Sequence, residues 1–591
     1  MSRIPGWTKV SKAVGWALAH QIQYLSLALR LALFAGVALC AQLAGPAWAG
    51  VIYVRADATG TNNGHSWANA YTDLQAALAA AEWGDEIWVA QGTYKPTTGT
   101  DRNISFALEA GTGLYGGFAG TETDRAQRNW ETNATILSGD IGTTDTADNS
   151  YHVVTGANLA VLDGFTITGG NANALGSLNC GGGMHNYNSS PTVTNCTFTG
   201  NTADFNGGGM YNNNSSPTVT NCTFSGNTAN SGGGGMYNSY NSPTVTNCTF
   251  SGNTAGNFGG GGMCNYYYGS PTVTNCTFSG NTVSNGNGGG MYNYQYSSPT
   301  VTNCTFSGNT ANSGGGGGMY NIYSSPTLTN CTFSGNSAGW GGGGMSNSSS
   351  SPTVTNCTFS GNTAGNFGGG MYNGRAMYYD SGSSPTVANC IFWDDTAPSG
   401  AEIYNNIGTP TFSHCDIKGS GGSGPLWNPA LGVDGGGNIM ANPRFVAPFA
   451  PAGPDGLWRT NDDGLRLQSD SPCIGAADPA VAPETDILGL PRGSAPDIGA
   501  YEFASGGGSY TLTYNAGAGG SISGTTPQTV DYGANGSEVT AVPNTGYRFV
   551  RWSDGVMTAS RTDTNVTANI TVTAMFAHSN PATAKDWSLY E

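Results

Sequence analysis

The sequence predicts an all-β protein whose central body is a right-handed parallel β-helix, a solenoid with three short strands in each coil. The first observation is composition: 93 of the 591 residues are glycine and 9% are charged, against about 7% and about 25% in average proteins. The second is a sequence repeat of 26 to 28 residues, which returns eight times between Cys180 and Cys390. The third is the regular placing of Val, Cys, Phe and Met within that repeat, which favours an ordered solenoid over a disordered chain.

Residues 1–49 are predicted to be an export signal peptide. They begin with a basic stretch that includes Arg3 and Lys12, continue with the apolar run 31–39, and end on the small-x-small cleavage site 47–49. The apolar run is too short for a comfortable membrane span. An uncleaved N-terminal anchor is the alternative interpretation.

Net charge excludes some partners. Removal of residues 1–49 takes away four basic residues and changes the formal charge from −17 to −21. Without a basic patch the protein cannot neutralise phosphates, so we expect no nucleic-acid partner. We expect a bacterial secreted or cell-surface protein that is peripheral or anchored rather than membrane-spanning, with a polysaccharide or a host or neighbouring cell surface as partner.

Residues 50–160 are predicted to form the N-terminal cap and the first coils. The segment 71–78 has the pattern of an amphipathic helix, and the strand-like segment 85–94 follows it. A helix there would cover the open end of the solenoid, where unpaired strand edges otherwise invite aggregation.

Residues 161–420 are predicted to form the repeat coils. Strand alternation turns Val193 inward, and Cys196 and Phe198 can both point inward only if the chain bends at Asn195. A second bend is expected at Asn201, because asparagine tolerates the left-handed backbone conformation. Coils about 4.8 Å apart then stack identical side chains into ladders.

Cysteines form one of these ladders. In an exported protein cysteines are usually bridged, and stacked Cα atoms about 4.8 Å apart would permit disulfides. We favour free buried thiols, because the position is inward and its neighbours are apolar; Cys180, Cys264 and Cys473 fall outside the ladder and could pair. The ladder cysteines are Cys196, Cys222, Cys248, Cys276, Cys304, Cys331, Cys357, Cys390 and Cys415.

Two short motifs of the repeat carry a family resemblance. The motif Phe-Ser-Gly-Asn, as at 224–227, alternates with Gly-Gly-Gly-Met and resembles the repeats of polymorphic outer membrane proteins. That family belongs to the pectate-lyase-like β-helix group, and the resemblance covers residues 160–420. It implies a surface-exposed β-helix, although this chain has Gly-Met where the family prefers Ala-Ile or Ala-Val.

Residues 421–503 are predicted to form the closing coils and the C-terminal cap, and they resemble the closing segment of choice-of-anchor exported proteins. A Gly/Ser linker, 504–509, follows. Residues 510–577 alternate apolar and polar positions and resemble a divergent internalin-type B repeat, a small β-rich module of surface proteins. Residues 578–591 are predicted to be a tail.

Charged residues are nearly absent from the repeats, which limits catalysis. Between Asp163 and Arg375 the only formally charged side chain is Asp204, so the repeats alone cannot supply the carboxylates and bases that polysaccharide lyases and hydrolases use. If the protein is an enzyme, its site is predicted near residues 375–418 or in the N-terminal coils. Solvated turns are the favoured interpretation of these acidic residues, because the Gly-His-Gly and Arg-Ile-Lys segments of polygalacturonase-like enzymes are missing. The candidate catalytic residues are Asp394, Asp395, Glu402 and Arg375, with Lys418 nearby.

No cofactor and no metal site are predicted, with Ca²⁺ as the one ion that the sequence leaves open. The segment 461–464, Asn-Asp-Asp-Gly, offers carboxylates for Ca²⁺, but this sequence is also typical of an ordinary turn. The turn is the favoured interpretation.

Tyrosines supply the candidate binding residues. Six are expected in the turn between the Met strand and the Pro-Thr strand, where flat amphipathic rings could stack on sugars; ordinary outward-facing residues are the alternative. Outward Thr-x-Thr rows, as at Thr218 and Thr220, also allow an ice-binding array. The six tyrosines are Tyr266, Tyr267, Tyr268, Tyr294, Tyr296 and Tyr323.

Three functional hypotheses follow. The first is an exported β-helix scaffold without catalysis, adhesin-like or glycan-contacting. The second is a polysaccharide lyase or glycoside hydrolase with its site near residues 375–418. The third is ice binding by the threonine array.

Overall fold

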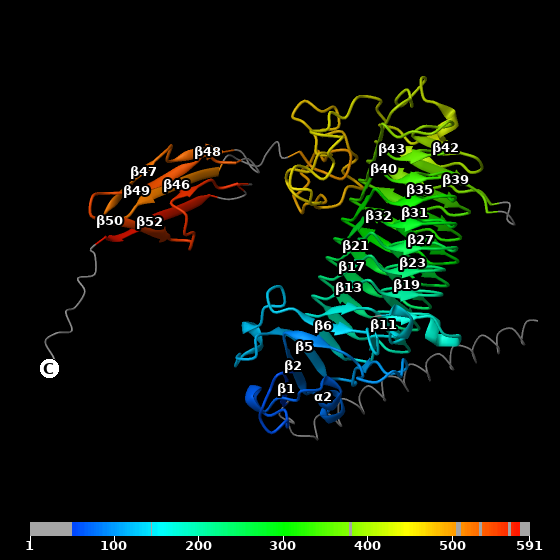
Figure 1. The fold of residues 1–591 in the computed structure, drawn as a ribbon. Helices are drawn as coiled ribbons and strands as arrows, with labels where there is room; N and C mark the ends of the chain where they lie inside the picture. Colours follow the sequence, from blue (N-terminus) through cyan, green and yellow to red (C-terminus); the bar gives the residue numbers. More distant parts are fainter. Residues whose placement is uncertain are drawn as a thin grey trace, which may run out of the picture.

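The computed structural model describes residues 50–143, 145–376, 381–503, 510–530, 535–564, 566 and 569–579. The predicted signal peptide and linker, and most of the predicted tail, lie outside these ranges. The all-β parallel solenoid is confirmed, as is the small β-rich C-terminal module (Figure 1). Four parallel sheets of 14, 12, 11 and 8 strands run along the solenoid.

A helix covers the first coil, as expected. Strand β1 (Val51–Val54) pairs with β2 (Glu86–Ala90), and α2 (Leu74–Ala80) lies between them in sequence. Asp73 caps the helix by accepting a hydrogen bond from the backbone N–H of Gln75 at 3.0 Å. Leu74, Ala77 and Leu78 are buried in the same apolar core as the repeat coils.

Each repeat coil contains four strands, one more than predicted. One coil comprises β12 (Thr192–Thr194), β13 (Thr197–Thr199), β14 (Thr202–Ala203) and β15 (Met210–Asn213), and each strand pairs in register with its copy in the next coil. The first bend is at Asn195, with φ of 51°, as expected. The second bend is at Gly200, with φ of 63°. Asn201 instead points inward and is fully buried.

Stacked side chains fill the solenoid. The ladder positions of Val, Cys, Phe and Met are at most 1% exposed. Neighbouring phenylalanine rings from Phe198 to Phe392 stack with centroids 4.5 to 4.8 Å apart. The ladder cysteines are free and buried. Burial raises the pKa of thiols such as Cys331 well above the ordinary value, so they behave as small apolar groups.

Two buried asparagine ladders, which the sequence analysis did not foresee, run beside the apolar ladders. From Asn186 to Asn405 each amide N–H donates to the amide oxygen one coil further, at 2.8 to 2.9 Å. The second ladder begins at Asn201. From Asn227 to Asn362 each of its amides also donates to a phenylalanine carbonyl; Asn227, for example, bonds the carbonyl of Phe198 at 2.9 Å. A buried polar network is favourable when its members are satisfied in this way.

Close backbone approach explains the glycine before each methionine. A Cβ at Gly262 would lie 2.6 Å from the carbonyl oxygen of Gly290 and 2.8 Å from the Phe278 ring. Any side chain there would collide with the next coil. In the repeat coils, from Gly183 to Gly370, the residue before each methionine is therefore glycine.

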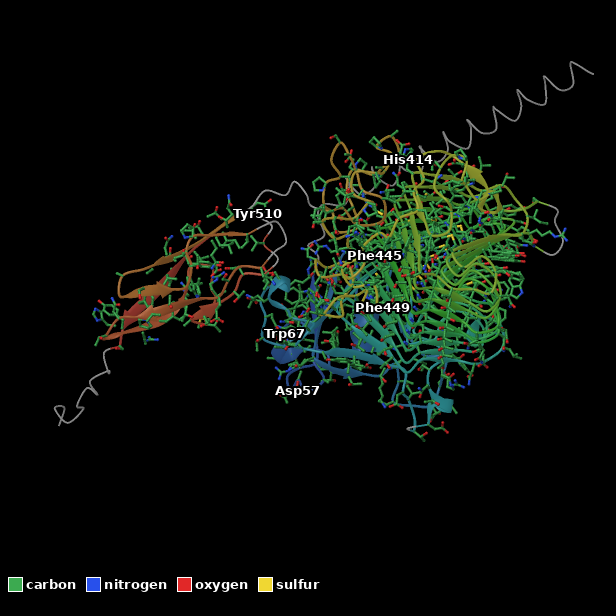
Figure 2. The ribbon with its side chains drawn as sticks, turned by 90° about the horizontal axis from the view of Figure 1, so that it is seen from above. Asp57, Trp67, His414, Phe445, Phe449 and Tyr510 are labelled. Atoms are coloured by element: carbon green, nitrogen blue, oxygen red, sulfur yellow. The ribbon has the colours of Figure 1, made fainter. Side chains whose placement is uncertain are left out.

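The closing segment covers the solenoid flank, which differs from the predicted cap. Residues 441–503 form a lobe beside the coils; Figure 2 shows Phe445 within it (Figures 1 and 2). Outward residues of the β13 sheet, such as Thr305 and Thr332, are buried. Outward amides at the bends anchor the lobe, because Asn356 donates to the carbonyls of Asp497 and Gly499 at 3.1 and 3.2 Å.

The end of the solenoid is covered by a shorter segment. It contains the 3-10 helix η5 (Pro429–Leu431) and strand β45 (Val433–Asp434). Leu431 is buried in the main core, and Trp427 lies 6.3 Å from the Phe412 ring between centroids. Apolar contact thus closes the last coil.

The C-terminal module contains two small sheets. In the first, β46 (Tyr510–Ala516) pairs with β48 (Gln528–Val530) and β52 (Ile570–His578), and β50 (Tyr547–Trp552) pairs with β52. The second contains β47 (Gly520–Ser523), β49 (Val539–Pro543) and β51 (Ser560–Arg561). Leu512, Tyr514 and Trp552 are buried in the core of the module.

Candidate functional site

Asp394 and Asp395 are adjacent in sequence but have opposite environments. They follow β41 (Ile391–Trp393), and Asp394 takes the bend position with φ of 62°. It is exposed and forms an ion pair with Lys418 at 2.5 Å. Asp395 points inward and is 3% exposed, at the end of the asparagine ladder. Its Oδ1 accepts hydrogen bonds from the backbone N–H and the side-chain amide of Asn362, at 2.7 and 2.8 Å.

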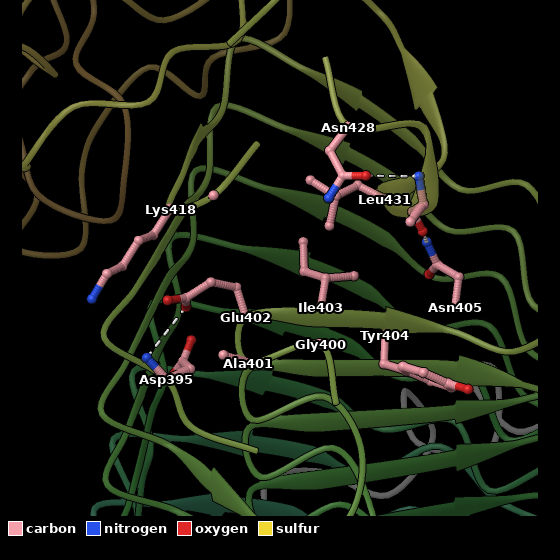
Figure 3. Close-up of a pocket in the computed structure, with 12 residues that line it drawn as sticks. Asp395, Gly400, Ala401, Glu402, Ile403, Tyr404, Asn405, Lys418, Asn428 and Leu431 are labelled. Carbon is pink, nitrogen blue, oxygen red and sulfur yellow. Dashed lines mark hydrogen bonds between the residues drawn. The ribbon is translucent and has the colours of Figure 1, made fainter. Parts of the chain in front are cut away.

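Glu402 occupies the position that is glycine in the repeats. It precedes β42 (Ile403–Asn405), and the register with β39 (Met371–Gly374) aligns it with Gly370. Strand β42 is the last of its sheet, so no further strand excludes the side chain. Glu402 Oε2 accepts a hydrogen bond from the backbone N–H of Asp395 at 3.2 Å (Figure 3).

A cavity of about 550 Å³ lies over this carboxyl pair, between the last full coil and the terminal cover. Asp395 and Glu402 line one side, and Leu431 of η5 lines another (Figure 3). Lys418 is the cationic residue of the lining. The volume lies within the range of small-molecule sites.

Burial makes the two carboxyl groups hold protons at unusually high pH. It raises the pKa of Asp395 well above its ordinary value, and the nearby charge of Glu402 adds to the effect. Burial also raises the pKa of Glu402 to about 7. Among the described residues, Asp395 Oδ2 has no hydrogen-bond partner. Glu402 can therefore gain or lose a proton near neutral pH.

The structure assembles only part of the catalytic set suggested by the sequence. Asp395, Glu402 and Lys418 line the cavity, and Asp394 pairs with Lys418 outside the lining. Arg375 is exposed and is not among the residues that line the cavity. Glycosidases hold their two carboxyl groups about 5 to 9.5 Å apart with the sugar between them. Here Glu402 is hydrogen-bonded to the backbone of Asp395 itself.

The tyrosines form a surface of stacked rings. Tyr266 and Tyr294 end β23 (Met263–Tyr266) and β27 (Met291–Tyr294), and their rings stack at 5.1 Å. Tyr268 and Tyr296 lie in the turns that follow, with stacked rings 5.4 Å apart and exposed fractions of 59% and 64%. We call the following residues the tyrosine platform: Tyr240, Tyr266, Tyr267, Tyr268, Tyr294 and Tyr296.

One platform member was missed by sequence reasoning. Tyr240 stacks on Tyr267 at 5.7 Å with nearly parallel rings. The missed signal is its register, because Tyr240 takes the same turn position one coil earlier. Tyr323 lies in the corresponding turn two coils after Tyr267, with φ of 53°.

An apolar cluster supports the platform from below. Phe258 packs edge-on against Tyr266 and Tyr294, at 5.2 and 5.4 Å between ring centroids. Buried Cys264 and Tyr292 complete the support. These contacts fix the rings of Tyr266 and Tyr294 in a set orientation.

The structure also shows where the threonine rows and the acidic turn at 461–464 lie. Thr218, Thr244 and Thr272 are exposed in register on the outer face of the β12 sheet. In the acidic turn, Asp463 Oδ2 accepts the Tyr501 hydroxyl at 2.7 Å, and Asp462 Oδ1 accepts that of Thr460 at 2.6 Å. Within the ranges described above, no three His, Cys, Asp or Glu side chains gather as a metal site.

Family comparisons agree with this architecture. Residues 148–306 and 273–438 match the family model described as the right handed beta helix region. The repeat body is a right-handed β-helix. Residues 510–580 match the divergent InlB B-repeat domain, which confirms the predicted module after the β-helix. The chain matches no curated protein.

Several solved structures are similar in fold alone. Pectate lyase Pel9A is 16% identical, with 76% of this chain and 96% of that chain covered and a TM-score of 0.41. XylC in complex with xylose is 8% identical, with coverage of 77% and 98% and a TM-score of 0.36. PfbA, a surface adhesin of Streptococcus pneumoniae, is 13% identical, with coverage of 58% and 87% and a TM-score of 0.24.

In the part of the chain that the structure describes, no helix combines the length and the apolar character needed to cross a bilayer.

Proposed function

We propose that this protein is an exported or cell-surface β-helix scaffold that binds glycans through the tyrosine platform, without catalysis. The observation that carries the proposal is the pair of exposed, stacked rings of Tyr268 and Tyr296. Tyrosine combines a flat apolar face with a hydroxyl group, so it can stack on a sugar ring and hydrogen-bond its hydroxyls. Rings repeated on successive coils suit a repeating polymer.

The backbone under the platform is preorganised. The backbone N–H of Tyr240 donates to the carbonyl of Tyr267 at 2.9 Å, and that of Tyr268 donates to Gln295 at 3.2 Å. The N–H of Tyr296 donates to Tyr323 at 2.8 Å. A turn whose backbone is already fixed loses less conformational entropy on binding than a mobile one.

We predict that the double variant Tyr268→Ala/Tyr296→Ala binds polysaccharide about 10- to 100-fold more weakly than the unmodified protein. Each lost aromatic contact is worth about 0.5 to 1.5 kcal/mol beyond its buried area. Affinity electrophoresis in gels with neutral or uronic-acid polysaccharides measures the change.

Tyr187→Ala is the matched control. Tyr187 is 59% exposed on the same face and lies three coils before Tyr268, roughly 14 Å away at the strand spacing. We expect it to bind like the unmodified protein. Equal retardation of all three proteins would contradict the platform.

Polysaccharide cleavage, by a lyase or a hydrolase reaction, is the competing function, and one observation favours it. The Glu402 carboxyl group, with its pKa raised by burial to about 7, suits a general acid near neutral pH. A screen on uronic-acid and neutral polysaccharides, with and without Ca²⁺, would read unsaturated products and new reducing ends. Turnover that Glu402→Gln abolishes and Asp394→Asn preserves would overturn the scaffold proposal.

We also assign a role in attachment to the C-terminal module. Residues 510–580 match a domain type distinct from the β-helix and have their own apolar core. We propose that this module attaches or spaces the scaffold at a host or neighbouring cell surface.

A further inference from the structure

A second cavity, of about 710 Å³, lies on the N-terminal coils, far in sequence from the tyrosine platform. Its floor includes Trp88 of β2, and one wall is the loop between β5 (Gly113–Phe118) and β6 (Thr135–Ser138). Arg125 and Trp130 of this loop line the cavity. The volume is ordinary for a small-molecule site, and aromatic walls with a few polar groups are typical of one.

The loop is held rigidly in place. The Glu122 carboxylate accepts backbone N–H groups of residues 119, 120 and 121 at 2.6 to 3.0 Å. Asp124 and Gln127 form a capping box, and the backbone N–H of Asn129 donates to Gly117 at 2.8 Å. These bonds present Trp130 with 40% of its surface exposed. A fixed, exposed indole adds little to the core and is suited to contact with a ligand.

Both arginines of the cavity lining are already paired with carboxylates. Arg125 bonds Glu86 at 2.5 Å, and the other oxygen of Glu86 accepts the indole N–H of Trp88 at 2.8 Å. Arg128 pairs with Asp163 at 2.6 Å and lies 5.1 Å from the Trp130 ring centroid. An anionic sugar would have to displace Glu86 from Arg125. A neutral sugar could share the same carboxylate and guanidinium groups through its hydroxyls.

We propose that the cavity between Trp88, Arg125 and Trp130 binds a neutral hexose or pentose unit of a glycan. The inference rests on the proposed function only for its ligand class, since it uses a different site. Trp130 supplies the stacking face, and Arg125 and Glu86 supply a donor and an acceptor for neighbouring hydroxyls. The paired charges select against uronic acids.

The test uses the whole protein labelled with 5-fluorotryptophan. Fluorine NMR follows the Trp130 signal, assigned with Trp130→Phe, during titration with xylohexaose, cellohexaose, mannohexaose, maltohexaose and hexagalacturonate. We expect at least one neutral hexasaccharide to shift this signal. Calorimetry should show at least tenfold weaker binding of that sugar to Trp130→Ala, and Trp130→Phe should retain part of the affinity.

Two control variants separate this site from other effects. Trp83→Ala removes an indole that is 66% exposed on the same coils but outside the cavity lining. This variant should bind the neutral hexasaccharide as tightly as the unmodified protein does. Tyr268→Ala/Tyr296→Ala should also retain hexasaccharide binding, so failure of the platform would leave this inference standing. No shift with any neutral hexasaccharide, binding of hexagalacturonate alone, or full affinity in Trp130→Ala would overturn it.

Discussion

Replacing Arg492 with methionine is expected to destabilise the closing lobe, which packs on the β-helix, by about 3 to 5 kcal/mol, the usual cost of breaking a buried ion pair. The Arg492 side chain is 1% exposed and pairs with Glu502 at 2.9 Å. It also donates to the carbonyls of residues 497, 499 and 500 and to the Asn330 amide oxygen across the interface. Methionine fills a similar volume but leaves the buried Glu502 carboxylate without its cation and removes one hydrogen-bond donor from each of these carbonyls.

Hydrogen exchange is the measurement for this prediction. Amides of residues 441–503 should exchange faster in Arg492→Met, while those of the distant coils around Phe224 should not change. Arg444→Met is the matched control, because Arg444 pairs with Asp470 in the same lobe and both side chains are more than half exposed. That change should cost less than about 1 kcal/mol. Equal protection of the lobe in both variants would show that Arg492 does not anchor it.

The position of the lobe could not be predicted from the sequence. Identical coils determine the interior, because Val193, Cys196 and Phe198 repeat at fixed spacing and a parallel coil stacks like on like. The lobe has no repeat, and its docking depends on single contacts such as that of Arg492 with Asn330. Neighbours 162 positions apart in sequence leave no periodic signal. The segment could therefore be identified as a closing element but not placed on the flank.

The carboxyl pair of Asp395 and Glu402 could also be predicted only in part. Sequence proximity grouped Asp394, Asp395 and Glu402, but it treated all three as surface residues. The repeat contained the missing signal: Phe-Trp-Asp-Asp at 392–395 aligns with Phe-Ser-Gly-Asn, which assigns Asp394 to the bend and Asp395 to the inward ladder. Arg375 gave no such signal, because it lies outside the repeated motif. Register thus separates buried from exposed acids where sequence proximity cannot.

Asp395→Asn is expected to stabilise the last coil at alkaline pH by roughly 1 to 3 kcal/mol, the cost of a buried group left unsatisfied. Asparagine would continue the ladder, since its amide could donate to the carbonyl of Phe359 as Asn362 donates to that of Phe333 at 2.9 Å. An ionised aspartate has no donor to offer. The variant also removes the charge that faces Glu402.

The two raised pKa values make the stability of the folded protein fall as pH rises. Burial raises the pKa of Asp395 well above its ordinary value and that of Glu402 to about 7, so the folded protein holds protons that the unfolded chain releases near pH 4. The stabilising contribution is complete below about pH 4, and that of Glu402 is lost as pH rises through about 7. For each proton that only the folded protein holds, the free energy of unfolding falls by up to about 1.4 kcal/mol for every unit that the pH rises within that window.

Denaturant unfolding at about pH 5 and at about pH 8.5 distinguishes the variants. Asp395→Asn should gain more at the higher pH and flatten the decline, because one of the two titrating groups is gone. Asp394→Asn, the same change one residue earlier on an exposed ion pair, should stay within about 1 kcal/mol at both values. If Asp395→Asn were instead less stable at about pH 8.5, the buried carboxylate would have to be favoured by a bound cation. In that case the carboxyl pair would be a ligand site and not merely the end of an asparagine ladder.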